Sequence, residues 1–230
     1  MNKLSVIVPF YNEERYLKKS IQRLLVENIF EKIILVDDCS TDDSFNIALS
    51  ISQRYKHIDL ISTLKNSGKG YAIKIALKEV ETSHVIVHDA DLEYFPNDIP
   101  EMFHEASKNK NILVLGSRVI GKKERSTLYK STFYGQKIFS IIFSFLHRKK
   151  ISDIASCYWL LETENLRRMD ICENGFAIEI EVLSKAIKNR LKIIEIPIKY
   201  EARSYEEGKK ILFKDALNIF FKIFKYFILK

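Results

Sequence analysis

Cysteine is scarce in this sequence, with three cysteines among 230 residues. Cys39, Cys157 and Cys172 are far apart and odd in number, so they match neither a fully paired disulfide framework nor the spacing of a zinc site. This pattern is typical of reduced thiols, and we expect a cytoplasmic protein.

Long apolar runs are also missing. No uncharged stretch reaches the roughly 18 residues that a bilayer-spanning helix needs. The first apolar run, Leu4–Val8, is too short to be the core of a signal peptide. We therefore expect neither a signal peptide nor a spanning helix.

Glycine is rare, with seven in the chain, and its placement excludes two nucleotide-binding motifs. Residues 9–13 (PFYNE) follow the first apolar run without any glycine, which disfavours a dinucleotide-binding Rossmann turn. Residues 67–70 (SGKG) resemble part of a phosphate-binding loop. They lack its earlier glycine and the Ser or Thr after the lysine, which excludes a Walker site.

Positive charge is concentrated in two segments of a chain whose formal net charge is +7. Residues 118–150 contain nine Lys or Arg and one acid, and residues 203–230 contain seven Lys or Arg and three acids. Such segments suit anionic lipids or phosphorylated ligands. No nucleic-acid recognition module accompanies them, so we expect no nucleic-acid partner.

Apolar runs alternate with helix-like periodicity through the first half of the chain. The expected strands are Leu4–Val8, Lys32–Val36, Ile58–Ser62, His84–His88 and Ile112–Leu115, with helices between them. This alternation predicts an α/β fold with a mainly parallel sheet covered by helices on both faces.

The second half of the chain is less regular. We expect helices at Phe133–Leu146 and Ile178–Lys188, strands at Ser156–Leu161 and Leu191–Tyr200, and a last helix from about Lys210. Pro197 predicts an edge position for its strand. We expect the chain to form one domain at residues 1–210, followed by an amphipathic C-terminal helix at residues 211–230.

Polar side chains collect where the expected strands end. Asp37 and Asp38, the acids at 89–93, and Arg118 each follow a strand. One such end alone is usually a turn or a helix cap, but several ends on one sheet edge favour a ligand site. Asp89, Asp91 and Glu93 alternate in an extended segment and could share one Mg²⁺ or Mn²⁺ ion. The alternative is a group of solvated turn acids.

Taken in order, five segments resemble a family 2 glycosyltransferase with the GT-A nucleotide-diphospho-sugar transferase fold. They are SVIVPFYNEERYL, ILVDDCSTDDS, NSGKGYAIKIAL, VHDADLEYFPNDI and GSR. The resemblance covers nearly the whole chain, and it extends to dolichol-phosphate mannose and glucose synthases and to bacterial polyprenyl-phosphate glycosyltransferases. It implies inverting, metal-dependent transfer of a hexose from a UDP- or GDP-linked sugar to a polyprenyl or dolichyl phosphate at the cytoplasmic membrane face.

The resemblance also implies roles for individual residues. The implied nucleotide-sugar pocket is formed by Pro9, Asn12, Glu13, Asp37, Asp38, Gly68, Lys69 and Asp89, with Asp38 binding the base. The implied metal ligands are Asp89, Asp91 and Glu93, and the implied catalytic residues are Asp91, Arg118 and Arg203. The arginines would face phosphates of the donor or the acceptor. Further acceptor or phosphate contacts are expected from Asp153, Ser156, Lys209 and Lys210.

One segment departs from the pattern Asp-x-x-Ser-Gly-Phe-Arg of the related synthases. Asp153 and Ser156 match it, whereas residues 157–159 are Cys-Tyr-Trp. One phosphate-binding arginine is therefore expected to be absent, which leaves the acceptor open. A sugar acceptor would need a general base, whereas a lipid phosphate is already an anion. Glu179, Glu181 and Asp153 are the candidate bases, and their alternative role is to form structural ion pairs.

Two amphipathic segments suggest peripheral membrane contact. Lys214, Asn218, Lys222 and Lys225 share one stripe of an otherwise apolar C-terminal helix, and residues 133–150 are apolar up to a basic cluster. Alternatively, these helices pack on the domain, on a second copy in a homodimer, or on a separate membrane partner. The rival functions are transfer to a growing surface glycan, nucleotidyl transfer, and a non-catalytic membrane scaffold.

Overall fold

The computed structural model describes residues 2–121, 125–126, 130–203 and 213–228. Its main sheet has seven strands in the order β3-β2-β1-β4-β7-β5-β8, and a small second sheet pairs β6 with β9. The strands are β1 (Leu4–Phe10), β2 (Phe30–Asp37), β3 (Ile58–Ser62), β4 (His84–Val87), β5 (Ile112–Ser117), β6 (Arg125–Ser126), β7 (Trp159–Glu162), β8 (Lys192–Pro197) and β9 (Tyr200–Glu201).

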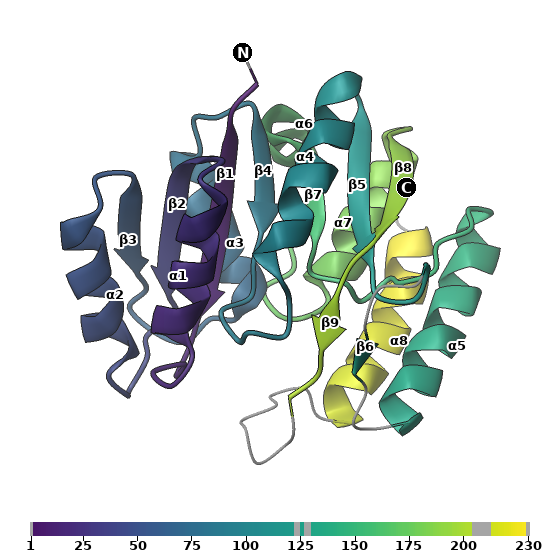
Figure 1. Cartoon of the computed structure of the whole chain (residues 1–230). Helices are drawn as coiled ribbons and strands as arrows, with labels where there is room; N and C mark the ends of the chain where they lie inside the picture. Colours follow the sequence, from purple (N-terminus) through teal and green to yellow (C-terminus); the bar gives the residue numbers. More distant parts are fainter. Residues whose placement is uncertain (1, 122–124, 127–129, 204–212, 229–230) are drawn as a thin grey trace.

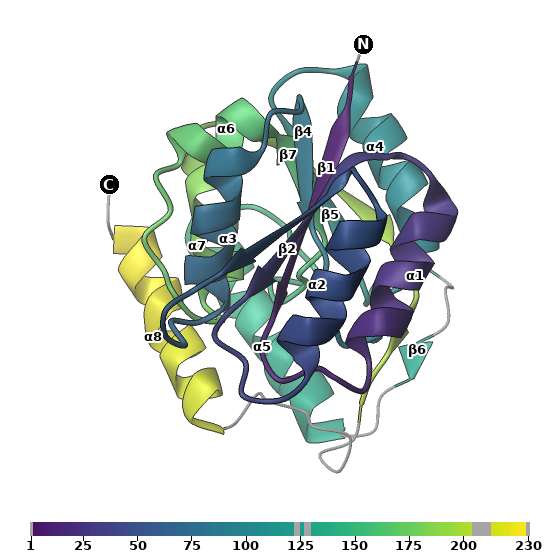
Figure 2. The same cartoon turned by 90° about the vertical axis from the view of Figure 1, so that its left-hand side faces the viewer.

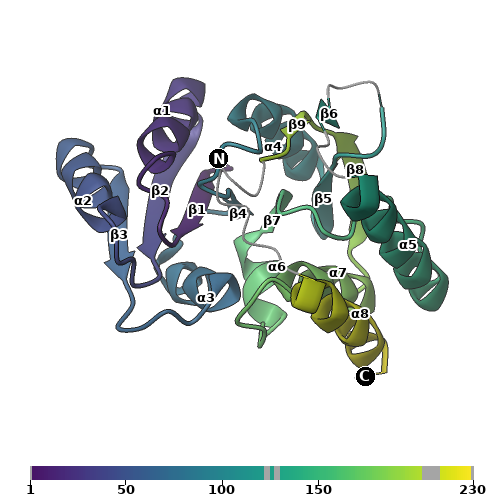
Figure 3. The same cartoon turned by 90° about the horizontal axis from the view of Figure 1, so that it is seen from below.

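Helices cover both faces of the main sheet, as Figures 2 and 3 show. The helical segments are α1 (Leu17–Glu27), α2 (Ser44–Arg54), α3 (Lys69–Glu79), η1 (Pro96–Asp98), α4 (Ile99–Lys108), α5 (Lys130–His147), α6 (Thr163–Arg168), α7 (Ile178–Lys188) and α8 (Phe213–Ile228). One apolar core lies under α1, α2 and α4, and the other under α3, α5, α6, α7 and α8. The predicted α/β class is confirmed.

All strand pairs of the main sheet are parallel except those of β7, which runs antiparallel to β4 and β5. The carboxyl ends of β1, β2 and β4 therefore meet at one edge, close to β9 (Figure 1). The polar segments that follow β1, β2 and β4 in the sequence leave the sheet at this edge. This is where a ligand site is expected in an open α/β sheet.

Two predicted strands of the second half differ from the structure. Residues 156–158 form a turn before β7, in which Ser156 Oγ accepts a hydrogen bond from the Tyr158 N–H at 3.3 Å. The expected strand Leu191–Tyr200 is divided, because Pro197 ends β8 and the Lys199 N–H donates to Asp98 Oδ2 at 2.7 Å instead of to a strand. The predicted edge position of Pro197 is confirmed, since β8 is the last strand of the sheet.

The C-terminal helix α8 packs on the domain along part of its surface. Ile223 and Tyr226 are buried in the same core as α7. No helix in the described ranges is long and apolar enough to cross a bilayer.

Candidate functional site

The loops after β1 and β2 are joined by hydrogen bonds of one residue, Asn12, through its backbone and its side chain. Asn12 Oδ1 accepts the Thr41 N–H at 2.8 Å, and the Asn12 N–H donates to Ser40 Oγ at 3.0 Å. Glu13 follows, and its N–H donates to Ser44 Oγ at 2.8 Å. The two polar loops therefore form one surface at the sheet edge.

Asp38 organises the turn between β3 and α3. Its carboxylate accepts the backbone N–H groups of Ser67 at 3.0 Å and Gly68 at 2.6 Å, and the Thr63 hydroxyl at 3.0 Å. Asp37 accepts the Ser40 N–H at 3.1 Å in the next loop. The structure thus brings Asp38 and Gly68 together, as a shared nucleotide pocket requires.

Lys69 connects that turn to β4 and α7. Its Nζ lies 2.8 Å from Asp89 Oδ1 and 2.8 Å from Glu179 Oε1. Burial alone would lower the pKa of Lys69, but Asp89 and Glu179 outweigh it and raise that pKa well above its ordinary value. Burial would raise the pKa of Asp89, and Lys69 reverses this, so Asp89 stays ionised.

Arg203 reaches back from β9 to the ends of β1 and β4. Its Nη1 lies 3.0 Å from Glu13 Oε2, and its Nη2 lies 3.3 Å from Asp91 Oδ2. The guanidinium also lies 5.1 Å from the ring centre of Tyr16. Although it lies 112 residues after Asp91, Arg203 belongs to the same site.

Glu93 does not join Asp89 and Asp91 at one point, contrary to the expected three-carboxylate set. Its carboxylate accepts the Tyr200 hydroxyl at 2.6 Å and the Arg203 N–H at 2.9 Å. Within the described ranges, no three His, Cys, Asp or Glu side chains gather as a metal site. Glu93 is held by β9, and Asp89 is held by Lys69.

The remaining acids still fit a hard cation. Burial and the neighbouring charges of Glu93 and Asp89 raise the pKa of Asp91 to about 8, against the opposing charge of Arg203. Four carboxylates, those of Glu13, Asp89, Asp91 and Glu93, therefore lie beside two cations, Lys69 and Arg203. Mg²⁺ and Mn²⁺ prefer such oxygen donors and take one or two carboxylates with phosphate oxygens and water.

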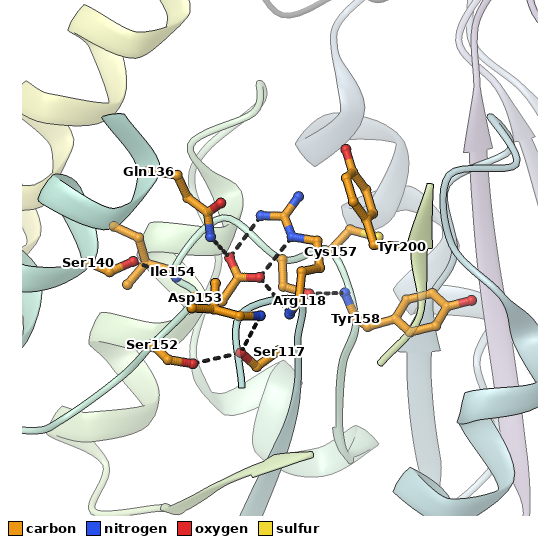
Figure 4. A network of polar contacts seen from close by, with 12 residues as sticks. Ser117, Arg118, Gln136, Ser140, Ser152, Asp153, Ile154, Cys157, Tyr158 and Tyr200 are labelled. Atoms are coloured by element: carbon orange, nitrogen blue, oxygen red, sulfur yellow. Dashed lines mark hydrogen bonds and ion pairs between the residues drawn. The ribbon is translucent and has the colours of Figure 1, made fainter. Parts of the chain in front are cut away.

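Arg118, at the end of β5, is fixed by Asp153 (Figure 4). Its Nε and Nη2 lie 2.7 Å and 2.8 Å from the two oxygens of Asp153, and Gln136 of α5 donates to the same carboxylate. The guanidinium also lies 4.9 Å from the ring centre of Tyr200. Asp153 is fully buried and holds a bidentate ion pair, which argues against a role as a general base.

The segment that departs from the related synthases is buried. Trp159 begins β7 and has no exposed surface, so it adds no charge to the site. The Tyr158 hydroxyl lies 2.6 Å from Nδ1 of His88, the residue before Asp89. Burial, reinforced by Arg23 and Lys69, lowers the pKa of His88 to about 4, so this buried pair is neutral.

Three of the eight non-glycine residues with positive φ in the described ranges lie at the same edge of the sheet. Asn12, Cys39 and Leu92 have positive φ angles of 51°, 63° and 65°, and each lies just after β1, β2 or β4. Positive φ is uncommon for residues other than glycine and often occurs at functional sites.

The expected residues therefore fall into three sets. A first group converges at the carboxyl ends of the strands: Asn12, Glu13, Asp38, Gly68, Lys69, Asp89, Asp91 and Arg203. In the second set, Pro9 is buried within β1, Asp37 and Ser156 hold local turns, Glu93 is held by β9 and the Arg203 backbone, and Arg118 pairs with Asp153. Lys209 and Lys210 lie outside the described residues.

Sequence reasoning missed Gln136, Tyr200 and Glu173 as contributors. Tyr200 and Gln136 contact site residues that are distant in the sequence, and no local motif marks either of them. Glu173 binds three side chains of α8.

The chain is similar in sequence and in fold to several known proteins. The profile of glycosyl transferase family 2 matches residues 5–169. A dolichol-phosphate mannosyltransferase of Pyrococcus furiosus is 29% identical over 225 residues, covering 95% of this chain and 63% of that protein. A UDP-N-acetylglucosamine–dolichyl-phosphate N-acetylglucosaminyltransferase of Methanococcus voltae is 28% identical over 239 residues, covering 95% of this chain and 93% of that protein.

A solved structure has the same fold. Glucosyl-3-phosphoglycerate synthase from Mycobacterium tuberculosis, in complex with Mn²⁺, uridine diphosphate and phosphoglyceric acid, superposes with a TM-score of 0.75 at 17% identity, covering 100% of this chain and 80% of that one. The chain spans about two thirds of the length of several relatives, for example 65% of a dolichyl-phosphate β-glucosyltransferase of Trichomonas vaginalis. The expected GT-A fold is confirmed, and the chain belongs to glycosyl transferase family 2.

Proposed function

We propose that this chain is an inverting, metal-dependent glycosyltransferase that passes a hexose from a UDP- or GDP-linked sugar to a polyprenyl or dolichyl phosphate. Relatives named for transfer to dolichyl phosphate support the acceptor class. The observation that carries the proposal concerns the candidate general bases.

Each of the three candidate carboxylates, Asp153, Glu179 and Glu181, already forms an ion pair in this structure. Asp153 pairs with Arg118, and Glu179 pairs with Lys69. Glu181 has no exposed surface, pairs with Lys185 at 2.7 Å and accepts backbone N–H groups of the segment before α7. A phosphate acceptor is already an anion and needs no base, so it suits this site better than a sugar hydroxyl does.

The donor side is formed by the turn at Gly68, by Asp38 and by the acids of β4. Asp38 and the Gly68 turn would bind the nucleoside, and Lys69 keeps Asp89 ionised beside it. A divalent cation held by Asp89 and Asp91 would supply Lewis-acid stabilisation of the leaving diphosphate. Arg203, held by Glu13 and Asp91, would stabilise negative charge as it grows on the leaving group.

The acceptor side is assigned to Arg118, whose Asp153 partner also contacts α5. An acceptor phosphate oxygen bonds to the anomeric carbon while the bond from that carbon to the donor diphosphate breaks. The electron pair leaves with the nucleoside diphosphate, and attack from the opposite side inverts the anomeric carbon.

An apolar face on α5 and α8 supports peripheral contact with the cytoplasmic side of the membrane. Ile138, Ile141 and Phe145 of α5 are 55%, 61% and 79% exposed, and Phe221 of α8 is 66% exposed. The two helices lie side by side, with the rings of Phe139 and Phe220 6.1 Å apart (Figure 1). The exposed basic residues 148–150 follow α5, as anionic head groups would favour.

The first test is release of nucleoside diphosphate from a panel of UDP- and GDP-sugars in the presence of polyprenyl phosphate. We expect release with Mg²⁺ or Mn²⁺, none with EDTA, and a loss of at least about a hundredfold in Asp91→Ala. No binding of any nucleotide sugar by the folded protein would overturn the enzyme and leave the scaffold interpretation.

A further inference from the structure

Glu173, in the segment before α7, binds the C-terminal helix. Its Oε1 accepts the Tyr226 hydroxyl at 2.5 Å and the Lys222 ammonium at 2.5 Å, and Lys225 lies 3.4 Å away. Burial would raise the pKa of Glu173, but the hydrogen bonds from Lys222 and Tyr226 lower it, so the carboxylate is ionised. One buried anion therefore holds three donors of α8.

The backbone around Glu173 is fixed from α7. Glu181 accepts the N–H of Glu173 at 2.7 Å and the N–H of Cys172 at 2.9 Å. Segment 172–175 is thus held at its backbone by α7 and at its Glu173 side chain by α8. Figure 3 shows α3, α7 and α8 on the same face of the sheet.

The other side of segment 172–175 supports the start of α3. Asn174 O accepts the Tyr71 N–H at 3.1 Å, and Lys74 Nζ donates to Asn174 Oδ1 at 2.6 Å and to Cys172 O at 2.9 Å. The fit is tight, because a Cβ added to Gly68 would lie 2.5 Å from Asn174 O. No side chain separates the segment from the turn.

That turn carries the donor side of the site. Its Gly68 N–H binds Asp38, and its Lys69 binds Asp89. A continuous set of contacts therefore runs from α8 through Glu173 and Asn174 to the two acids. Packed contacts of this kind transmit a change in one element to the next.

We propose that Glu173 is a positioning residue for the donor site. It anchors segment 172–175 to α8, and the segment in turn sets the position of the Gly68–Lys69 turn against Asp38 and Asp89. We expect its effect on donor affinity, because the turn that the segment supports carries Gly68 and Lys69. The inference rests on the proposed function for the identity of the donor, but the mechanical link from α8 to the turn does not depend on it.

The test compares Glu173→Ala with the wild-type chain in two measurements. We expect the KM for the nucleotide sugar to rise about tenfold, the KM for the lipid phosphate to change less than twofold, and amide hydrogen exchange to quicken at residues 66–74. Glu164→Ala, which breaks the exposed pair with Arg168, is the matched control and should change neither.

A double-mutant cycle tests whether the effect passes through α8. Tyr226→Phe keeps the ring and removes the hydroxyl, so Glu173→Ala with Tyr226→Phe should be no worse than Glu173→Ala alone. If Glu173→Ala does not fold, Glu173→Gln and Lys222→Met replace it, with the same expected exchange at 66–74.

Unchanged exchange at 66–74 alongside faster exchange in α8 would overturn the inference. An equal rise in both KM values would also overturn it, because that indicates general loosening. If the wild-type chain binds no nucleotide sugar, the proposed function fails, and the exchange measurement alone still decides whether Glu173 positions the turn.

Discussion

Lys69 Nζ lies 2.8 Å from Glu179 Oε1, joining the turn after β3 to the first turn of α7 across 110 residues of sequence. The Lys69 side chain is 10% exposed and that of Glu179 is 7% exposed, so the pair is well shielded from water. Glu179 therefore contacts the same ammonium group that pairs with the ionised Asp89. We infer a positioning role for Glu179, which the sequence leaves as a candidate base.

Glu179→Gln distinguishes these two roles. We expect the KM for the donor to rise about tenfold, with a smaller change in kcat, because Lys69 keeps one of its two anions. A general base would instead contribute about a hundredfold or more to kcat. Full kinetics at several pH values check this, and a collapse of kcat at unchanged donor KM would contradict the positioning role.

Asp153→Asn tests the acceptor side. The substitution removes the charge that fixes Arg118 in a bidentate pair, and losing such a charged hydrogen bond corresponds to about 1.5–3 kcal/mol. We expect the KM for polyprenyl phosphate to rise about tenfold to a hundredfold, while donor binding measured by calorimetry stays the same.

Breaking a buried pair can cost stability, so Gln136→Ala serves as a milder variant with the same direction of effect. Asp59→Asn, which breaks the partly exposed ion pair between Lys32 of β2 and Asp59 of β3, is the control. Weakened donor binding with unchanged acceptor KM would show that Arg118 serves the donor instead.

Gly68→Ala tests the close packing of the Gly68–Lys69 turn against the backbone of Asn174. Gly68 has a φ of 96°, and an added Cβ would meet the Asn174 carbonyl. We expect a loss of about 1–3 kcal/mol in the free energy of unfolding, together with weaker donor binding. Gly135 in α5 has no heavy atom within 4 Å of an added Cβ, so Gly135→Ala should stabilise the protein by about 0.5–1 kcal/mol. Urea unfolding of both variants checks this, and equal effects would contradict it.

His147 gives the fold a defined pH dependence. Burial against Phe143, together with the charge of Lys188, lowers its pKa to about 4 from the ordinary 6.5, and Ser184 and Phe227 complete its surroundings. The unfolded chain therefore binds more protons between pH 6.5 and 4. The stability linked to neutral His147 is complete above pH 6.5 and is lost as the pH falls towards 4.

We expect that loss to be about 1–2 kcal/mol, since the ring is only partly buried. Because the carboxylates also titrate in this range, His147→Gln is the necessary comparison. Its free energy of unfolding should vary less than that of the wild type between pH 6.5 and 4. Parallel curves for the two proteins would contradict the assignment.

The sequence predicted the first half of the fold well because each element there is local. The strands of residues 4–115 alternate with helices at regular spacing, and that alternation alone indicates a parallel sheet. The antiparallel insertion of β7 between β4 and β5 depends on pairs 44 to 78 residues apart, from Leu115 with Trp159 to His84 with Glu162, which no local pattern predicts.

The site could be predicted only in part: the acids at the strand ends could be located from the sequence, but their partners could not. Strand ends could be located from the sequence, so Asp38, Asp89 and Asp91 were expected at one edge. The partners of the neighbouring acids Glu93 and Glu13 are not predictable, because Tyr200 and Arg203 reach them only after the chain has folded. Glu173 carries no motif, and its role follows only from its contacts with α8.

The acceptor is the point on which the account depends most, because an engaged set of carboxylates suits a phosphate and not a hydroxyl. The most direct measurement is the rate of nucleoside diphosphate release with Mn²⁺ and a matched donor, comparing polyprenyl phosphate with the corresponding polyprenol and with a short oligosaccharide. We predict that only polyprenyl phosphate raises the rate of nucleoside diphosphate release. The product should be a polyprenyl phosphate sugar whose anomeric configuration is the inverse of that in the donor, for example a β-linkage from an α-linked donor. Transfer to the oligosaccharide hydroxyl, with no response to polyprenyl phosphate, would contradict the account and assign the chain to surface glycan assembly.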